Sequence, residues 1–226
     1  GNFTHSGTFT NPDIALATLK MCYEAGAGDV MLIKADKEEF WRRSEHYETH
    51  RELLSRTTRS HGSNTLPVEK GVILKEAEII QEILELDTLI NLPVSKHHNG
   101  TFLTCSLKNM MGLCTRSTNV LFHNETGQPP TDKDRLAQCI ADLNTLREPD
   151  LTIADATVFI INNGPHGPGE LREEHTILAG TDPVAIDSYC AQLMGYEPGM
   201  VMSTEYAAAH GLGIADLSKI RVQQVS

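Results

Sequence analysis

Short apolar runs of strand length alternate with amphipathic segments of helical length along this chain, and this alternation constrains its fold most. The clearest example begins with the apolar run 151–161. A second short run, 176–180, follows it, and then comes a helical segment that begins at Pro183 and ends at Gly195. Strands that alternate with helices are typical of α/β proteins. We therefore predict an α/β fold with a mostly parallel sheet and helices on both faces, in a Rossmann-like three-layer arrangement.

Local patterns predict the individual elements. The spacing of apolar residues and the capping residues indicate helices at 12–25, 36–56, 79–86, 101–111, 132–146 and 183–193. Apolar runs indicate strands at 29–34, 72–74, 88–94, 151–161 and 176–180. The polar or glycine-rich segments 57–64, 95–100 and 162–169 are expected to be loops.

Length and composition suit one large domain over residues 1–226, with 40% hydrophobic residues to form a sizeable core. The net charge of −11 disfavours general binding to nucleic acid or to an anionic bilayer, although a local basic cluster could hold one small anion. No run approaches the ~20 apolar residues of a membrane span. The chain starts at Gly1 rather than Met, so a soluble protein, cytoplasmic or exported, is expected and any leader would lie upstream.

The cysteines are five in number and widely spaced. No Cys-x-x-Cys pair occurs, so the spacing predicts neither an iron–sulfur cluster nor a zinc ribbon in this chain. We expect all five to be free thiols, and most of them to be buried.

Basic side chains follow the predicted strand 88–94. Lys96 and His98 leave its end, and Lys108 and Asn109 follow ten residues after His98. Because ligands of open α/β sheets bind beyond strand ends, these residues predict a site for an anion or a metal. On a helix over 101–111, Lys108 would share a face with Thr101 and Thr104. A polar loop followed by a helix with a solvent-facing lysine explains the same pattern, and the sequence leaves both interpretations open.

A second imidazole, His123, could join His98 in a metal site, although the pair lacks the spacing of a known metal motif. A structural role for His123 is the alternative.

The glycine-rich segment after the strand 151–161 offers a second set of candidates. Asn163 and Gly164 begin a loop whose backbone amides could approach a ligand, but a plain turn explains it equally well. Asp155 lies inside an apolar run and needs a partner, which a lysine or a metal would supply. Asp182 precedes Pro183 and is expected to cap the next helix, or else to line the site.

Several motifs, taken in order, resemble the family called domain of unknown function 362. They are Leu-Pro-x-x-Lys-x-His at 92–98, Leu-Lys-Asn-x-x-Gly at 107–112, Asp-Ala at 155–156 with Gly-Pro at 164–165, Asp-Pro-Val-Ala-x-Asp at 182–187 and Gly-Leu-Gly at 211–213. The resemblance implies a first strand that would lie upstream of Gly1. A more distant likeness to the nickel-dependent lactate racemase family implies comparable places for His98, Lys108 and His123.

Two function classes follow from these patterns. In the first, an enzyme-like cleft binds a small anionic or phosphorylated ligand or a nucleotide-type cofactor, with a divalent metal as a further candidate. Lys96 and Lys108 would then hold the anion, and His98 and Lys108 would carry any catalysis. In the second, the chain is a non-catalytic binding or redox-partner module whose reactive centre belongs to another protein.

Overall fold

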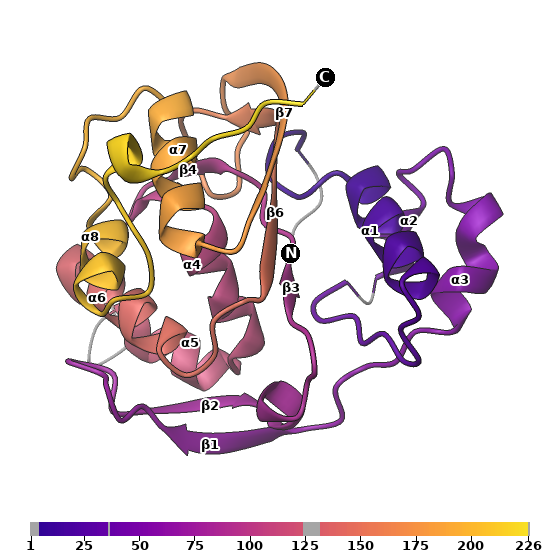
Figure 1. Ribbon diagram of the computed structural model, residues 1–226, viewed down its shortest axis with the longest axis horizontal. Coiled ribbons are helices and arrows are strands. Elements are labelled where there is room, and N and C mark those ends of the chain that lie inside the picture. Colours follow the sequence, from indigo (N-terminus) through magenta and orange to yellow (C-terminus); the bar gives the residue numbers. More distant parts are fainter. Residues whose placement is uncertain (1–4, 36, 124–131, 226) are drawn as a thin grey trace.

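The computed structural model describes residues 5–35, 37–123 and 132–225 of this mixed α/β protein (Figure 1). Its central sheet has the strand order β3 (Ile90–Asn91), β6 (Leu151–Ile160) and β7 (Leu171–Gly180). β3 runs parallel to β6, and β7 runs antiparallel to it. The parallel contact continues beyond β3, because Ser95 N donates to Asp155 O and Asp155 N donates to Pro93 O, both at 2.8 Å.

Two antiparallel hairpins complete the strands of the described part. They are β1 (Ser63–Pro67) with β2 (Glu76–Ile80), and β4 (Lys96–His98) with β5 (Phe102–Thr104). The sheets are therefore small and mostly antiparallel, and the predicted Rossmann-like parallel sheet is not confirmed. The physical reason is the connection after β6, which is a short loop rather than a crossover helix, so β7 returns antiparallel.

The helices with strong end signals lie where the sequence predicts them. α1 (Pro12–Glu24), α6 (Lys133–Asn144) and α7 (Pro183–Leu193) each begin after a capping side chain that accepts a first-turn amide. The other α-helices are α2 (Glu38–Trp41), α3 (Arg51–Ser55), α4 (Ser106–Asn109), α5 (Arg116–His123) and α8 (Met202–Ala209). Four 3-10 segments lie at Glu48–His50, Gln81–Leu84, Met110–Leu113 and Leu217–Lys219.

Several predicted elements are wrong. The segment 29–34 forms only a bridge between Met31 and Thr58. The predicted helix 36–56 is broken, over its described residues 37–56, into two short helices and a 3-10 turn. The segment 72–74 is a bend that Asp142 holds through the amides of Ile73 and Leu74. The predicted helix at 79–86 is the end of β2 and a 3-10 turn.

The predicted helix at 101–111 is wrong in a way that affects the site. Its first half is the strand β5, which pairs with β4 where a loop was expected, and α4 begins only at Ser106. Thr101, Thr104 and Lys108 therefore do not share a helical face. β-Branched and aromatic residues favour the hairpin, and the helix needs the remote cap described below.

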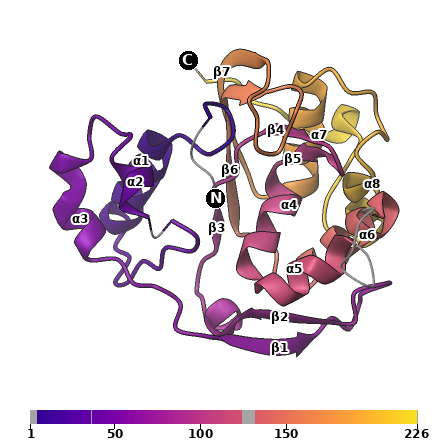
Figure 2. The same ribbon diagram turned by 180° about the vertical axis from the view of Figure 1, so that it is seen from behind.

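The core consists of three apolar clusters. The largest lies among β2, α4, α5 and α6, with Phe122 and Ile140 fully buried; the second lies between β6 and α7, around Phe159. The third belongs to the helices α1 and α2, around Leu16 and Trp41. Figures 1 and 2 show α4 and α7 on one side of β6 and the lobe of α1–α3 on the other. This arrangement places the end of β6, the β4–β5 hairpin and the segment before α1 next to one another.

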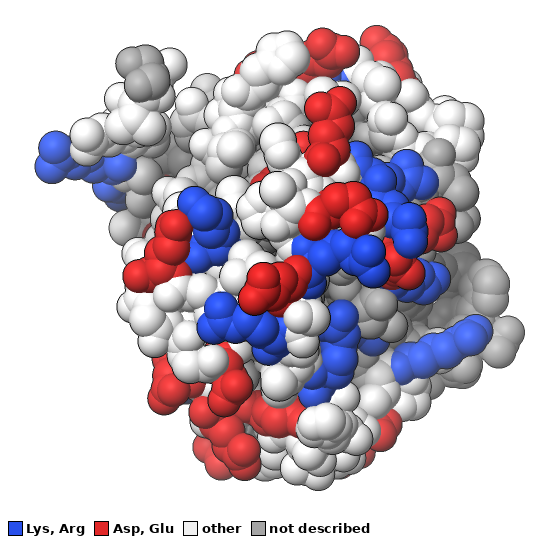
Figure 3. Space-filling model, turned by 90° about the vertical axis from the view of Figure 1, so that its right-hand side faces the viewer, with Lys and Arg blue, Asp and Glu red and all other residues white. Residues whose placement is uncertain are grey.

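Charged side chains are interleaved on the face of the α1–α3 lobe. Lysine and arginine alternate there with aspartate and glutamate (Figure 3). Pairs one helical turn apart account for much of this pattern, as in Lys20–Glu24 and Arg42–Glu38. None of the described helices is both long and apolar enough to cross a membrane.

Candidate functional site

The β4–β5 hairpin and α4 bring together four of the basic residues noted in the sequence. Lys96, His97 and His98 come from β4 and Lys108 from α4, and His123 at the end of α5 joins them. The pKa of His98 is lowered mainly by burial, and its four basic neighbours lower it further. Burial and then Lys96 also lower the pKa of Lys108. Below, the "basic cluster" means Lys96, His98, Lys108 and His123.

Lys96 joins three parts of the chain. Its ammonium donates to Thr8 O at 2.6 Å and to Pro165 O at 3.0 Å, which leaves one of its three N–H donors for another acceptor. Burial lowers its pKa to about 8. The side chain thus ties the segment before α1 to the loop after β6 while keeping a charge in the cluster.

The two neighbouring imidazoles contact different segments, as their alternation along a strand predicts. His97 Nδ1 accepts from Gly164 N at 3.0 Å. His98 Nδ1 accepts from Gly100 N at 3.0 Å and from Thr101 N at 3.3 Å. Because Nδ1 of His98 accepts, the proton of the neutral ring lies on Nε2. Burial and the neighbouring cations lower the pKa of His98 to about 3, so this ring is a neutral Nε2–H donor at pH 7.

Lys108 is the third residue of α4, and its only hydrogen-bond partner among the described residues is Met111 Sδ, at 3.3 Å. Burial, and then Lys96, lower its pKa to about 8. Among the described residues, neither Lys96 nor Lys108 forms an ion pair with a carboxylate. Two partly buried lysines therefore lie in one cluster, and neither has an acidic partner among the described residues.

Asp187 positions the helix that carries Lys108, a role that the sequence did not reveal. Its fully buried carboxylate accepts from Ser106 N at 2.6 Å and from Leu107 N at 3.1 Å, and so caps α4 from the middle of α7. Burial raises its pKa to about 7. In the sequence Asp187 stands one turn into the helical segment that Pro183 opens, and the local pattern indicates no partner for it. The contact spans 81 residues, so no local signal could have identified it.

Two predicted acids have structural partners. Asp155 accepts from Asn11 N at 2.7 Å and from both the amide and the hydroxyl of Thr157, so the expected lysine is not among its described partners. Asp182 caps α7 through Ala185 N and also accepts from Ile214 N. Because Gly180 pairs with Thr152, Asp182 follows the end of β7 that lies beside the start of β6, whereas the loop 162–169 follows the other end of β6.

The remaining candidates fix the surroundings of the basic cluster. Asn109 donates to Asn91 Oδ1 at 2.7 Å, and the exposed Asn163 bonds within its own loop, to Pro168 O at 3.4 Å. The amide of Gly164 is already committed to His97, and a Cβ at this glycine would lie 1.7 Å from His97 O. The loop after β6 therefore holds β4 in place by close packing.

The imidazoles do not fit a two-histidine metal site. A neutral histidine binds a metal through the nitrogen that lacks the proton. In His98 this nitrogen is Nδ1, which already accepts two amides. His123 is different, because its Nδ1 lies 2.8 Å from Asn119 O and must donate, which leaves the Nε2 lone pair available. No group of three or more metal-ligating side chains occurs in the described ranges.

The comparison with known families bears out the motif resemblance. The sequence matches the family "Domain of unknown function (DUF362)" over residues 1–192. The chain belongs to the DUF362 family. This DUF362 chain is also 28% identical over 134 residues to the thylakoid-associated protein sll1697 of Synechocystis sp. (strain ATCC 27184 / PCC 6803 / Kazusa). The matched region covers 59% of this chain and 40% of that relative, so the DUF362 chain spans less than half of the relative's length. All the residues of the basic cluster lie within the family match.

Proposed function

We propose that the basic cluster binds a small anionic ligand, of the phosphate or phosphorylated class. The observation that carries this proposal is the pair Lys96 and Lys108: after burial, Lys96 lowers the pKa of Lys108 further, and neither lysine has a carboxylate partner among the described residues. Two cations held together in a partly buried place cost free energy in the empty protein. A bound anion would remove that cost, and lowered pKa values of this kind are found often at functional sites.

The three contributing groups have different tasks in this proposal. Lys108 supplies the main charge, since its ammonium has no oxygen partner among the described residues. Lys96 supplies its third N–H, and His98 donates from Nε2 as a neutral group. A histidine whose pKa lies near 3 is a poor general acid or base at pH 7. The geometry therefore favours anion binding by His98 over proton transfer in the unliganded protein.

Calorimetric titration with inorganic phosphate, pyrophosphate and adenosine monophosphate at constant ionic strength tests the proposal. We expect saturable binding at pH 7 that weakens by about tenfold or more at pH 9.5, because lysines with a pKa of about 8 lose their charge between these values. Lys108→Met should abolish the binding, whereas Lys20→Met, at an exposed lysine paired with Glu24, should leave it unchanged. Equal binding by both variants, or binding that does not depend on pH, would refute the proposal.

A further inference from the structure

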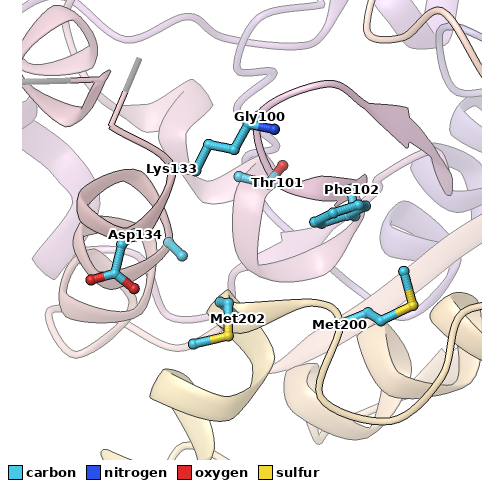
Figure 4. A pocket seen from close by; sticks show the side chains of 8 residues that line it. Gly100, Thr101, Phe102, Lys133, Asp134, Met200 and Met202 are labelled. Carbon is cyan, nitrogen blue, oxygen red and sulfur yellow. The ribbon is translucent and has the colours of Figure 1, made fainter. Parts of the chain in front are cut away.

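A pocket separate from the basic cluster opens beside the β4–β5 turn. Its volume is about 240 Å³, and it is lined by Gly100, Thr101, Phe102, Lys133, Ala137, Met200 and Met202, with Asp134 at its margin (Figure 4). Three segments that are distant in sequence meet here: the hairpin turn, the first turn of α6 and the start of α8. The two methionines lie beyond residue 192, where the family match ends. The pocket is thus formed in part by a segment outside the matched family region.

Phe102 is held in an unusual backbone conformation at the edge of this pocket. Its φ is +64°, a left-handed value that bulky residues rarely adopt. It follows a turn in which the amides of Gly100 and Thr101 both donate to His98 Nδ1. A glycine or an asparagine would suit the backbone better, yet the chain places an aromatic ring there and leaves it partly exposed.

The ring of Phe102 is supported on one side and open on another. Tyr196 packs edge-on against it, with ring centroids 6.0 Å apart, and the tyrosine hydroxyl donates to Phe102 O at 3.3 Å. Across the pocket lie two thioethers, and the exposed fractions are 39% for Phe102, 37% for Met200 and 40% for Met202. Thioethers and aromatic edges are favourable partners for another aromatic ring. A volume of about 150 Å³ suffices for benzene, so this pocket has room for one ring with a short substituent.

The charges at the rim favour a ligand with an acidic group. The ammonium of Lys133 lies 5.8 Å from the centre of the Phe102 ring, and no carboxylate among the described residues forms an ion pair with it. Asp134, the other charged residue of the lining, accepts a hydrogen bond from the Tyr206 hydroxyl. We propose that the pocket binds a small aromatic carboxylate, with the ring between Phe102 and the two methionines and the carboxylate at Lys133.

The test uses the full chain with ¹³C-methyl methionine, because Met200 and Met202 report directly on a ring placed against them. The chain has seven methionines, and Met21, which is 53% exposed and lies on α1, is an internal control for non-specific contact. Met200→Leu and Met202→Leu assign the two signals while keeping the apolar lining. Benzoate is the probe, benzyl alcohol is its uncharged counterpart, and cyclohexanecarboxylate is its non-aromatic counterpart, all at constant ionic strength.

We expect benzoate to shift the Met200 and Met202 methyl signals upfield in a saturable way and to leave Met21 unchanged. Phe102→Ala should weaken the binding of benzoate at least tenfold. The methyl signals of the buried methionines should stay at their wild-type positions in this variant, which would show that its fold is intact. Lys133→Met should weaken the binding of benzoate by about two- to fivefold, which is the usual effect of losing an exposed ion pair. The binding of benzyl alcohol should not change. Cyclohexanecarboxylate should compete poorly.

Four results would overturn this proposal. The first two are shifts that never saturate and shifts of equal size at Met21. The third is a Phe102→Ala variant that titrates like the wild type. The fourth is loss of the benzoate shifts in Lys108→Met, which would place the anion in the basic cluster instead. Lys108→Met therefore separates the two proposals: it should abolish phosphate binding and leave the methionine shifts unchanged.

Discussion

Replacing Lys108 with methionine tests the basic cluster most directly, because the change keeps the length and packing of the side chain and removes only its charge. The structure assigns a cost to that charge. The pKa of Lys108 falls from 10.5 to about 8, first through burial and then through Lys96. At about 1.4 kcal/mol for each pH unit, the folded protein disfavours this ammonium by about 3 kcal/mol at most. We therefore expect the unliganded variant to be more stable than the wild type at pH 7, by about 1–3 kcal/mol.

The pH dependence of this gain follows from the direction of the pKa change. Between pH 8 and 10.5 the unfolded lysine binds more protons than the folded one, so the wild type becomes more stable as the pH rises through this range. The advantage of Lys108→Met should be full below pH 8 and disappear by about pH 10.5. Phosphate should act in the opposite way. At a hundredfold excess over its Kd it stabilises the wild type by about 2.7 kcal/mol, and it should not stabilise the variant.

Thermal melts of wild type, Lys108→Met and the control Lys20→Met, with and without phosphate at matched ionic strength, measure both effects. For a chain of this size, 1 kcal/mol corresponds to about 2–4 °C in Tm. The control should stay within about 0.5 kcal/mol of the wild type. A loss of about 3–5 kcal/mol in unliganded Lys108→Met would mean that the lysine pairs with a buried carboxylate. Identical melts in every condition would mean that it is merely solvated, and either result would refute the argument.

Three further predictions concern neighbouring groups. His98→Asn keeps an acceptor for the turn amides, and Asp187→Asn removes a buried acid. In urea unfolding between pH 4 and 6, the stability of His98→Asn relative to the wild type should fall as the pH rises, because the pKa of His98 is about 3 in the folded protein. The relative stability of Asp187→Asn should rise, because the pKa of Asp187 is about 7, and each slope should reach at most about 1.4 kcal/mol per pH unit. Parallel slopes would contradict both assignments. Gly164→Ala should lower the free energy of unfolding by about 1–3 kcal/mol and weaken phosphate binding, because its Cβ would lie 1.7 Å from His97 O. Gly28→Ala is the control, since its Cβ would contact nothing. Calorimetric titrations and thermal melts compare the two variants. In thiol titrations, Cys22 alone should react rapidly in the native protein and all five cysteines after unfolding, because the other four are buried and free.

The sequence predicts those parts of the fold that depend on neighbouring residues. Asn11 and Asp182 each precede a proline and cap a helix as expected, and the apolar run after residue 150 forms the long strand β6. These signals are local, because a cap and its amide lie within three residues of each other. The sequence also predicts that Lys96, His98 and Lys108 gather beyond strand ends. After burial, both lysines lower the pKa of His98 further, but β4 and the short helix α4, which carry these residues, were not predicted, and a common site stays a prediction.

The parts that could not be predicted depend on contacts between distant residues. The segment 101–111 contains residues that suit a helix, but its first half pairs with β4, and its helix starts where Asp187 of α7 supplies the cap. Lys96 donates to Thr8 O, which lies 88 residues away in the sequence, and Asp155 accepts from Asn11 N, which lies 144 residues away. Nothing in the local pattern shows that a carboxylate within a strand has a backbone amide as its partner instead of a lysine. The antiparallel return of β7 was missed because the predicted strand begins only at residue 176, which leaves a connection, 162–175, long enough for a crossover, whereas β7 begins at Leu171.

The use of acidic residues supports the anion proposal independently of the lysines. The chain has 30 acidic and 19 basic residues, so carboxylates are abundant. Within the described ranges, the three fully buried acids, Asp142, Asp155 and Asp187, nevertheless accept from backbone amides, and each amide set fixes a segment of the fold. A buried lysine keeps its charge at a lower cost in free energy when an acidic side chain pairs with it, and this chain has many acidic residues that could do so. Lys96 and Lys108 lack such a partner among the described residues, while His98 stays neutral and adds no further repulsion. The charge that the fold leaves uncompensated at this place is therefore the charge that a bound anion would neutralise.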